Sequence, residues 1–583
     1  MKLIVVTGGV ISGVGKGVAT ASIGKILKEY GYSVTAVKID PYVNVDAGTM
    51  RPTEHGEVWV TEDGGEIDQD LGNYERFLDI DISKHSNITT GQVYRDVIQR
   101  EREGKYLGKT VQIIPHIIDE IKDRIRKAGN NHDFVLVEIG GTVGDYENIP
   151  FLFAVKSLEI ELGKKNVVYV LVSYLPTPIH MGEAKTKPTQ QAIRMLNENG
   201  ITPDFILCRA PRPIDEVRRK KIEVSSNISS EYIISAPDVA STIYRIPLNF
   251  EAENLGKKML EKFNLGPCRN PDWKRWRELV DNIENPREIF TIAMVGKYVG
   301  IGDFQLADSY ISINESLKHA AAELGGDVRI TWIDANELEA GGIERLRNFD
   351  GIIIPGGFGS SGVEGKINAI KYARENNIPF LGLCYGMQLA VIEFARNACS
   401  MTGAHTTEVD TNTPYPVIDI LASQKKLIEH SKYGGTMRLG AYAAVLKEGT
   451  RVLDLYRRAG RLETDGKAMS TMEKFRLGII AKHMFCKLHN SLDLCNIPSN
   501  ASVIIERHRH RYEVNPKYIE QMESKGLVFS GHHQKEDGTK LMEFTEMPDH
   551  HFFIATQAHP EFKSRFGKPA PLFLGFLEAC LKK

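Results

Sequence analysis

The chain has 583 residues, 42% of them apolar, and its 73 lysines and arginines nearly balance 75 aspartates and glutamates. At roughly 150 residues per domain, this length predicts two to four domains, and the composition excludes a disordered or fibrous protein. A net charge of −2 excludes a globally basic nucleic-acid binder, so any anion-binding ability must be local.

The cysteine content and the start of the chain both predict a protein of the reducing cytoplasm. Seven cysteines are an odd number, and they are scattered without the spacing of a disulfide framework. The first apolar run stops at Gly8 and Gly9, which is not the pattern of a signal peptide. No stretch approaches the roughly 20 apolar residues of a membrane span. We therefore expect a reduced, cytoplasmic protein with neither a membrane nor a nucleic acid as its partner.

The first half of the chain predicts alternating strands and helices. A buried strand over residues 3–7 leads into a glycine-rich loop at 8–17 and a helix at 18–30. Further strands are predicted at residues 33–39, 134–139, 166–172 and 205–208, with helices at 110–127 and 189–199. This alternation is typical of a parallel sheet with helices on both faces.

The alternation breaks near residues 264–286, where prolines and a polar, tryptophan-bearing helix predict a linker. Strands are predicted again at residues 289–295, 328–333, 350–355, 379–384 and 552–557. The fold class is therefore predicted as α/β with two doubly wound, mainly parallel sheets. We place the first domain at residues 1–265, the linker at 266–288 and the second domain at 289–583.

The loop after the first predicted strand is a candidate nucleotide site. Backbone N–H groups at the start of a helix attract phosphate, and Lys16 adds a positive charge. The loop departs from the usual triphosphate pattern, because Val10 replaces its first glycine and Gly17 replaces the metal-binding serine or threonine. An ordinary glycine-rich turn is the alternative.

A metal site is predicted from this departure. Without a hydroxyl at residue 17, a magnesium ion on the phosphates must be held mainly by carboxylates. Glu138 ends an apolar strand, at the edge where such sheets bind ligands. Asp70 lies in a polar loop among other acids, where a solvated carboxylate is the alternative. Asp70 and Glu138 are the predicted metal ligands.

Three groups of basic residues suggest a second anionic substrate. They are Lys185 with Lys187, Lys38 just before Asp40, and residues 218–221. Each alone is more often a solvated run of charge. Gathered at the strand ends of one domain, they would neutralise a second triphosphate.

Several of these stretches together resemble the CTP synthase family, the glutamine-dependent amidoligases that make CTP from UTP. The resemblance runs over nearly the whole chain in a constant order. The matching stretches are residues 8–17, 38–42, 55–57, 61–64, 70–72, 137–145 and 185–190.

A cysteine in the second domain has the setting of a nucleophile. Gly382-Leu-Cys384-Tyr-Gly386 lies between a predicted strand and a predicted helix, which is the form of a nucleophile elbow. The helix start lowers the pKa of such a thiol. His559 would act as base and Glu561 would orient its imidazole. A lone cysteine is usually structural, but the elbow and the His-Pro-Glu sequence favour a catalytic role.

This second set resembles the class I glutamine amidotransferases, in which a thiolate attacks the glutamine amide and releases ammonia. The resemblance makes the amides of Gly357 and Tyr385 the oxyanion donors. It assigns glutamine binding to Gln388, Glu408 and Arg511.

For the first domain, the family resemblance implies that ATP phosphorylates O4 of UTP and that ammonia displaces the phosphate. Lys38 would assist the transfer. The implied ATP-binding residues are Ser12, Gly13, Val14, Gly15, Lys16, Gly17, Arg209, Asp238 and Val239. The implied UTP-binding residues are Ser12, Asp145, Tyr146, Glu147, Lys185, Lys187, Gln190 and Lys221.

The resemblance also implies regulation and assembly. Ammonia would pass through an internal tunnel, with His55 as its gate. CTP would inhibit by sharing part of the UTP site, and GTP would activate the glutaminase step. A homotetramer is expected, with filament formation left open.

Two single residues and one longer stretch depart from the family. Tyr385 stands where leucine is commoner, and Ser361 where arginine is usual. Residues 458–500 form a probable insertion, whose apolar spacing predicts an amphipathic helix with a role in oligomer contacts. A zinc site is the less favoured alternative there; its ligands would be His483, Cys486, His489 and Cys495.

Two other functions stay open at this point. One is an amidoligase of the same plan with a different acceptor, such as a cobyrinate-type amidase, which the stretches at 137–145 and 185–190 disfavour. The other is a structural or filament-forming relative with inactive sites, which the presence of Lys16, Cys384 and His559 disfavours.

Overall fold

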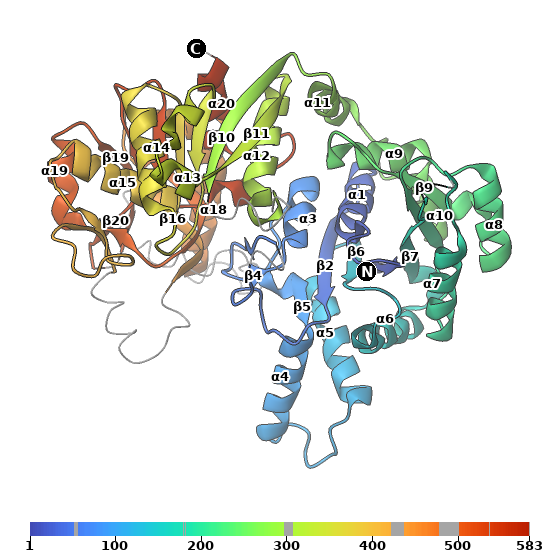
Figure 1. Ribbon diagram of the computed structural model, residues 1–583. Helices are drawn as coiled ribbons and strands as arrows, with labels where there is room; N and C mark the ends of the chain where they lie inside the picture. The colour runs from blue at the N-terminus through green and yellow to red at the C-terminus, as the bar shows by residue number, and fades with distance from the viewer. Residues whose placement is uncertain are drawn as a thin grey trace. The chain divides into compact units, whose positions relative to one another are not determined.

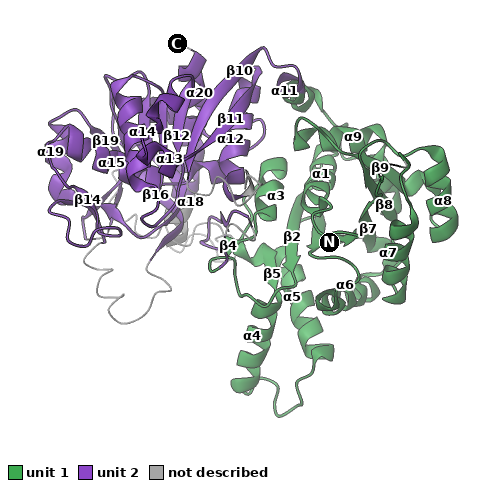
Figure 2. Ribbon diagram, viewed as in Figure 1, with its two compact units in different colours: residues 1–49, 66–280 green, residues 50–65, 281–583 purple. Residues whose placement is uncertain are grey.

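The computed structural model describes residues 1–51, 56–178, 180, 182–296, 307–420, 437–476, 501–535 and 537–581. They form two compact units (Figure 2). Unit 1 consists of Met1–Thr49 and Glu66–Val280, and unit 2 of Met50–Gly65 and Asp281–Lys583. Both units are α/β, which confirms the predicted fold class.

Unit 1 is built on a parallel sheet in which every neighbouring pair of strands runs in the same direction. Its strand order is β5-β2-β6-β1-β7-β8-β9 (Figure 1). The central strand β6 is buried along its whole length, as its apolar sequence requires. The strands are β1 (Lys2–Gly9), β2 (Val34–Asp40), β5 (Asn87–Thr89), β6 (Phe134–Ile139), β7 (Val167–Tyr174), β8 (Phe205–Ala210) and β9 (Ile233–Pro237).

Helices cover the sheet of unit 1. Leu3 and Val5 of β1 share one core cluster with apolar residues of the helices that follow β5, β6 and β7. The helices are α1 (Lys16–Glu29), α3 (Asp70–Leu78), α4 (Thr90–Arg102), α5 (Ile118–Ala128), α6 (Ile149–Leu162), α7 (Lys187–Glu198), α8 (Glu216–Ser226), α9 (Ile246–Ala252), α10 (Leu255–Lys262) and α11 (Lys274–Glu284).

One predicted helix of unit 1 is shorter than expected. The prediction of a helix over residues 110–127 was wrong at its start, because regular helix α5 begins only at Ile118. Pro115 explains the difference, since a proline ring inside a helix clashes with the preceding turn. Ile113–Ile117 forms a kinked turn instead.

Unit 2 contains a nine-stranded mixed sheet, with both parallel and antiparallel pairs of strands. Five strands pair in parallel, and the sheet then continues through four antiparallel strands that we did not predict. In spatial order they are β11 (Gly326–Asp334), β10 (Glu288–Gly296), β12 (Gly351–Ile354), β13 (Phe380–Leu383), β21 (Phe553–Thr556), β20 (Lys540–Glu546), β19 (Val528–Gln534), β16 (Arg438–Leu446) and β17 (Val503–His510).

The helices of unit 2 are α12 (Ile311–Glu323), α13 (Ala335–Glu339), α14 (Val363–Glu375), α15 (Tyr385–Asn397), α17 (Arg451–Arg458), α18 (Arg461–Arg476), α19 (Ile519–Glu523) and α20 (Pro571–Leu581). The remaining short strands are β14 (His405–Thr406), β15 (Pro416–Asp419) and β18 (Glu513–Val514), which form a small sheet, together with β3 (Trp59–Val60) in unit 2 and β4 (Glu66–Ile67) in unit 1.

Helix α18 lies in the predicted insertion and protects the edge strand β17. Arg461 donates to the carbonyl of Ile505 at 2.8 Å, and Asp465 accepts from the N–H of the same residue at 3.0 Å. An edge strand otherwise exposes unpaired backbone groups. The first part of the insertion therefore has a structural role within its own unit.

None of the helices in the described ranges has both the length and the apolar character needed to cross a lipid bilayer.

Candidate active sites

The glycine-rich loop of unit 1 connects β1 to α1. Gly13 and Gly15 have positive φ values of 69° and 87°, which glycine adopts without strain. Lys16 is buried, and its Nζ donates to the carbonyl of Gly141 at 2.8 Å. A Cβ at residue 17 would overlap the carboxylate of Asp70. Asp70 therefore occupies the space that the usual loop gives to a serine or threonine side chain.

Acidic residues surround Lys38 beside this loop. Lys38 on β2 and Glu138 on β6 are register partners at the carboxyl ends of neighbouring strands. The Nζ of Lys38 lies 3.2 Å from Asp40 Oδ1 and 3.4 Å from Asp68 Oδ1, and it also pairs with Asp70. The two predicted metal ligands and the predicted transfer lysine thus lie in one cluster.

The pKa values of this cluster reflect burial and crowding. Burial alone would lower the pKa of Lys38, but the carboxylates of Asp40, Asp68 and Asp70 outweigh it and hold that pKa well above its usual value. Burial lowers the pKa of Lys16 despite nearby Glu138. Burial, with Asp70 as a like charge, raises the pKa of Glu138 to about 7. This centre holds more negative charge than its lysines balance.

A magnesium ion would bind here through few protein ligands. Among the described residues, no group of three or more His, Cys, Asp or Glu side chains is arranged to hold a metal ion. Magnesium is usually bound by one or two carboxylates together with substrate phosphates. The carboxylates of Asp70 and Glu138 fit that pattern, because both are hard oxygen donors next to the phosphate loop.

Arg209 closes one side of the loop. Its Nη2 donates to Asp238 Oδ1 at 2.5 Å and its Nη1 to the carbonyl of Val14 at 3.4 Å. A small pocket beside it is lined by Gly15, Arg209, Ala236, Pro237, Ile246 and Phe250. Val239 is half-buried two residues past β9. These groups lie next to the start of α1.

The residues predicted for the second triphosphate form two further groups in unit 1. Glu183 gathers Lys185 at 3.4 Å, Arg218 at 2.7 Å and Lys221 at 3.9 Å. Lys187 is exposed at the first position of α7, and Gln190 donates to Thr186 one turn earlier. These contacts bring Lys185 and Lys221 together.

The other group follows β6. Asp145 accepts from the N–H of Thr142 at 2.6 Å and from its hydroxyl at 2.9 Å, which fixes the turn before α6. Tyr146 and Glu147 are exposed and line a groove of about 380 Å³ with Pro41 and Tyr94. Ser12 is exposed in the glycine loop. The contacts of Asp145 lie within the turn after β6, whereas Lys185 and Lys221 meet at Glu183.

In unit 2, Cys384 sits in a strained turn between β13 and α15. Its backbone has φ 50° and ψ −100°, a conformation that L residues avoid and that nucleophile elbows use. A Cβ at Gly386 would overlap the carbonyl of Ile354, and one at Gly382 would lie 2.9 Å from the Cβ of Ala555. Only glycine fits at both positions, so the sharp turn depends on them.

His559 and Glu561 lie beside this cysteine. Nδ1 of His559 is 2.7 Å from Glu561 Oε1. A Cβ placed on Gly356 would lie 3.0 Å from Cε1 of His559 and 3.7 Å from Cβ of Cys384, so both side chains border this glycine. Burial would lower the pKa of His559, but the Cys384 thiolate and Glu561 raise it to about 10. The arrangement keeps His559 charged beside the sulfur of Cys384, with its imidazole oriented by the carboxylate of Glu561.

The predicted glutamine-binding residues surround the cysteine. Gln388 donates to Gln557 at 3.2 Å, and Gln557 donates to Cys384 Sγ at 3.6 Å. Glu408 accepts from the amide of Gly359 at 3.0 Å, and Tyr385 donates its hydroxyl to the carbonyl of that residue at 2.9 Å. Gly357 belongs to the same loop, and Arg511 directly follows β17. Tyr385 and Glu408 thus hold the loop of the expected oxyanion donor.

The comparisons with known proteins cover both units. A family model of the CTP synthase N-terminus matches residues 2–265, and one of class I glutamine amidotransferases matches residues 305–579. The whole chain aligns at 50% identity with the CTP synthase of Methanocaldococcus jannaschii, of which 98% is covered. The CTP synthase of Pyrococcus furiosus is also 50% identical, over 99% of this chain and 98% of that protein.

The chain belongs to the CTP synthase family. It is therefore a ligase of pyrimidine biosynthesis that takes nitrogen from glutamine and uses ATP as co-substrate, as the resemblance predicted. The solved glutaminase domain of the Trypanosoma brucei CTPS, with bound acivicin, is 31% identical, covers 50% of this chain and 94% of that structure, and has a TM-score of 0.39.

Two acids near Lys38 were absent from the predicted site of this CTP synthase family member. Asp40 and Asp68 both contact its ammonium group. The signal was present, since Asp40 lies two residues after Lys38 and Asp68 two before Asp70, but acids in polar loops are usually solvated. His55, which we predict as the tunnel gate, lies outside the described residues, as do the alternative zinc ligands His483, Cys486, His489 and Cys495.

Proposed function

We propose that this chain converts UTP to CTP in two half-reactions, one carried by each unit. In the ligase half-reaction, the γ-phosphate of ATP passes to O4 of UTP, and ammonia then attacks C4 and displaces that phosphate. The carbonyl oxygen is a poor leaving group, whereas phosphate is a good one. The buried lysines Lys16 and Lys38, set against Asp70 and Glu138 behind the glycine loop, carry this proposal.

ATP binds at the glycine loop in this proposal. The amides of residues 12–17 and the ammonium of Lys16 bind its phosphates, and the pocket beside Arg209, Asp238 and Val239 takes the adenine. Lys38 stabilises the negative charge of the phosphoryl group in transit. Asp70 and Glu138 hold Mg²⁺, which neutralises phosphate charge when bound.

UTP binds through the second set of basic residues. Lys185, Lys187, Gln190 and Lys221 bind its triphosphate, and the Glu183 contacts that gather two of these lysines support this assignment. Ser12, Asp145, Tyr146 and Glu147 contact the remainder of the nucleotide. CTP carries the same triphosphate and inhibits by sharing part of this site.

The glutaminase half-reaction belongs to unit 2. The Cys384 thiolate attacks the amide carbon of glutamine, and the oxyanion accepts hydrogen bonds from the amides of Gly357 and Tyr385. His559 donates its proton to the departing ammonia, which leaves a glutamyl thioester that water hydrolyses to glutamate. Gln388, Glu408 and Arg511 bind the substrate. The elbow strain and the His559–Glu561 pair support these roles.

Regulation and assembly complete the proposal. Ammonia passes through an internal tunnel gated by His55, and GTP activates glutamine hydrolysis. The enzyme is a cytoplasmic homotetramer, with residues 1–265 as the ligase domain, 266–288 as the linker and 289–583 as the glutaminase domain. Exposed Ile149, Phe153 and Ile160 on α6 support a contact between copies, which multi-angle light scattering tests directly.

The deciding experiment supplies UTP, ATP, magnesium and glutamine and follows CTP by absorbance. A parallel reaction replaces glutamine with ammonium. We expect CTP from both nitrogen sources and no CTP when ATP is omitted. No CTP from either source would contradict the proposed function.

A further inference from the structure

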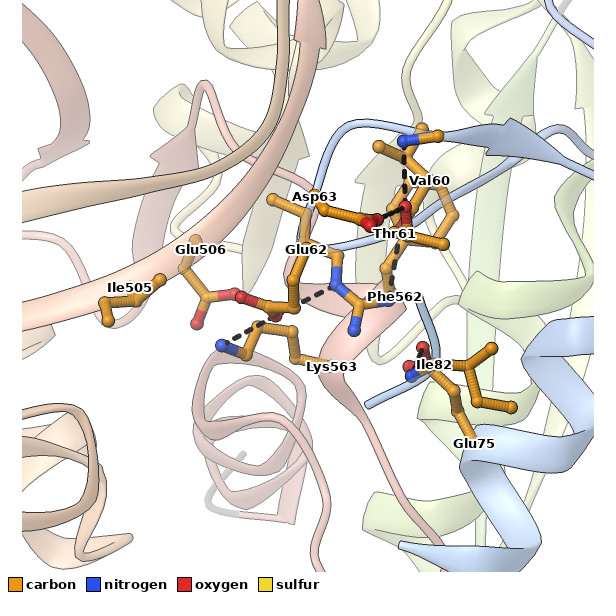
Figure 3. A network of polar contacts seen from close by, with 12 residues as sticks. Val60, Thr61, Glu62, Asp63, Glu75, Ile82, Ile505, Glu506, Phe562 and Lys563 are labelled. Carbon is orange, nitrogen blue, oxygen red and sulfur yellow. Dashed lines mark hydrogen bonds and ion pairs between the residues drawn. The ribbon is translucent and has the colours of Figure 1, made fainter. Parts of the chain in front are cut away.

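A short segment from the N-terminal part of the chain is packed into unit 2 beside the cysteine site. Glu62 Oε1 accepts from Arg507 Nε at 3.0 Å and pairs with Lys563 Nζ at 3.1 Å (Figure 3). Arg507 also donates to the carbonyl of Val60 at 3.0 Å. Arg507 and Glu62 are buried, so this is an internal ionic contact and not a surface pair.

Both cations that hold Glu62 are joined to the catalytic histidine or its carboxylate. The carbonyl of Arg507 accepts from the backbone N–H of His559 at 2.8 Å. Lys563 ends the tight turn Pro560–Lys563, which also contains Glu561. The carboxylate of Glu62 therefore ties strand β17 to the turn that carries Glu561.

An aromatic stack forms a second route to the same histidine. The ring of Trp59 lies 5.0 Å from that of Phe562. Phe562 in turn stacks on the imidazole of His559, with centroids 5.2 Å apart and planes 18° apart. The guanidinium of Arg507 lies 5.5 Å from the Trp59 ring, which joins the aromatic and ionic routes.

The backbone of the segment is also fixed to unit 2. The N–H of Ala441 donates to the carbonyl of Glu62 at 2.9 Å. A Cβ at Gly440 would lie 2.7 Å from the N of Gly64, so the two chain segments pass in direct contact. The position of Glu62 is thus set independently of its side-chain contacts.

We propose that Trp59 and Glu62 are positioning residues for His559 and Glu561 in the glutaminase reaction. Neither touches the reacting thiol; each acts through Phe562, Arg507 or Lys563. The ring stack fixes the plane of the imidazole, and the ionic contact fixes the turn that presents Glu561. This inference rests on the proposed glutaminase function. It assigns the support of the glutaminase site to two residues that lie shortly before Asp70, a proposed residue of the ligase site, in the sequence.

The test uses the full chain and measures glutamate release, which does not depend on CTP formation. For Glu62→Gln we expect kcat for glutamine hydrolysis to fall about 10- to 100-fold with KM changed less than about 2-fold, because a small misplacement of catalytic groups slows chemistry more than binding. Trp59→Leu should have a similar effect, whereas Trp59→Phe, which keeps a ring on Phe562, should recover most of the rate.

Two further variants separate positioning from folding. Asp63→Asn is the matched control, because the side chain of Asp63 accepts from Thr61 within the same segment at 2.6 Å. It should keep glutamine hydrolysis within about 2-fold, because it preserves the shape of the side chain and leaves Trp59 and Glu62 themselves unchanged. Lys563→Met removes one of the two cations, leaves the Arg507 contact, and should lower kcat less than Glu62→Gln does.

Ammonium-dependent CTP synthesis gives the contrasting readout. It should be retained in all these variants. Equal loss of both activities in Glu62→Gln, or an unchanged kcat for glutamine hydrolysis in both Glu62→Gln and Trp59→Leu, would overturn the positioning role. A parent enzyme that releases glutamate but makes no CTP would instead contradict the ligase part of the proposed function.

Discussion

The cysteine centre of unit 2 and the lysine centre of unit 1 are organised by different physical means. At the cysteine, backbone strain and a directed hydrogen bond place each group in one orientation: Cys384 is held in a left-handed conformation, and His559 is 2.7 Å from Glu561. At the lysines, several carboxylates gather around one ammonium group instead. Asp40, Asp68 and Asp70 all contact the single ammonium of Lys38.

This difference matches the chemistry proposed for each centre. A nucleophile must approach one carbon along one direction, so its orientation is fixed in advance. Phosphoryl transfer depends mainly on charge, and the lysine centre sets two lysines against four carboxylates, counting Glu138 with the three around Lys38. A divalent cation and the phosphates it accompanies would complete this balance. The variants below test whether the two centres can be disabled separately and by these different means.

The largest expected effect comes from removing the nucleophile. Cys384→Ala should reduce glutamine-dependent CTP formation by at least about 10⁴-fold, since no other group in the elbow can form the thioester. Ammonium-dependent CTP formation should persist, measured in the same absorbance assay. Lys16→Ala should lose both reactions, because it acts on the phosphates. Loss of the ammonium reaction in Cys384→Ala would mean that the two centres are not separable.

Glu561→Gln should lower the pKa of His559, so that its imidazole loses its proton more easily. The raised pKa of about 10 depends on Cys384 first and Glu561 second, so it should fall in this variant, with glutamine hydrolysis about 10²- to 10³-fold slower. In the parent chain, the charged imidazole of His559 adds to the free energy of unfolding. This contribution is fully present below about pH 6.5 and is lost as the pH rises through about 10. In the variant, this loss should occur at lower pH.

Alkylation of Cys384 by iodoacetamide, followed by peptide mass spectrometry, measures this change. In the parent, His559 stays charged beside Cys384 between about pH 6.5 and pH 9, so the alkylation rate should show no histidine titration in that range. The Glu561→Gln rate should change with pH there. Glutathione alkylated in parallel reports the pH dependence of the reagent itself. Identical Cys384 profiles in both proteins would show that Glu561 does not support the imidazolium.

Gly17→Ser tests the lysine centre by adding a hydroxyl that many phosphate loops contain. Its Cβ would displace the carboxylate of Asp70, which pairs with Lys38. We expect ammonium-dependent CTP formation to fall about 10- to 100-fold, with glutamine hydrolysis in the absence of nucleotides unchanged. The activity of Gly17→Ala should fall equally, because the Cβ alone already overlaps the carboxylate of Asp70. A serine variant as active as the parent would show that a hydroxyl can replace Asp70 as a ligand.

The sequence predicted those parts of both centres that depend on local pattern. An apolar run fixed the bounds of β6, Phe134–Ile139, and two glycines around Cys384 indicated the elbow. Strand β17 escaped prediction because its second half reads Glu-Arg-His-Arg-His. The charges of Glu506 and Arg507 become tolerable only once Arg461 and Glu62 pair with them. The packing of Trp59 against unit 2 is equally a long-range contact, which no local pattern encodes.

The smallest expected effect concerns Tyr385, whose side chain differs from the commoner leucine. Its hydroxyl donates to the carbonyl of Gly359, and Glu408 accepts from the N–H of the same residue, so both backbone groups of one residue in the Gly357 loop are held. Tyr385→Phe removes one hydrogen bond, worth about 1 kcal/mol, and should slow glutamine hydrolysis about 3- to 10-fold. Burial raises the pKa of Tyr385, so the hydroxyl stays protonated and the ratio of the two rates should be independent of pH. If the two rates are equal, Glu408 alone orients the loop. The expected oxyanion donor at the cysteine centre would then be positioned by a carboxylate, just as carboxylates position Lys38 at the lysine centre.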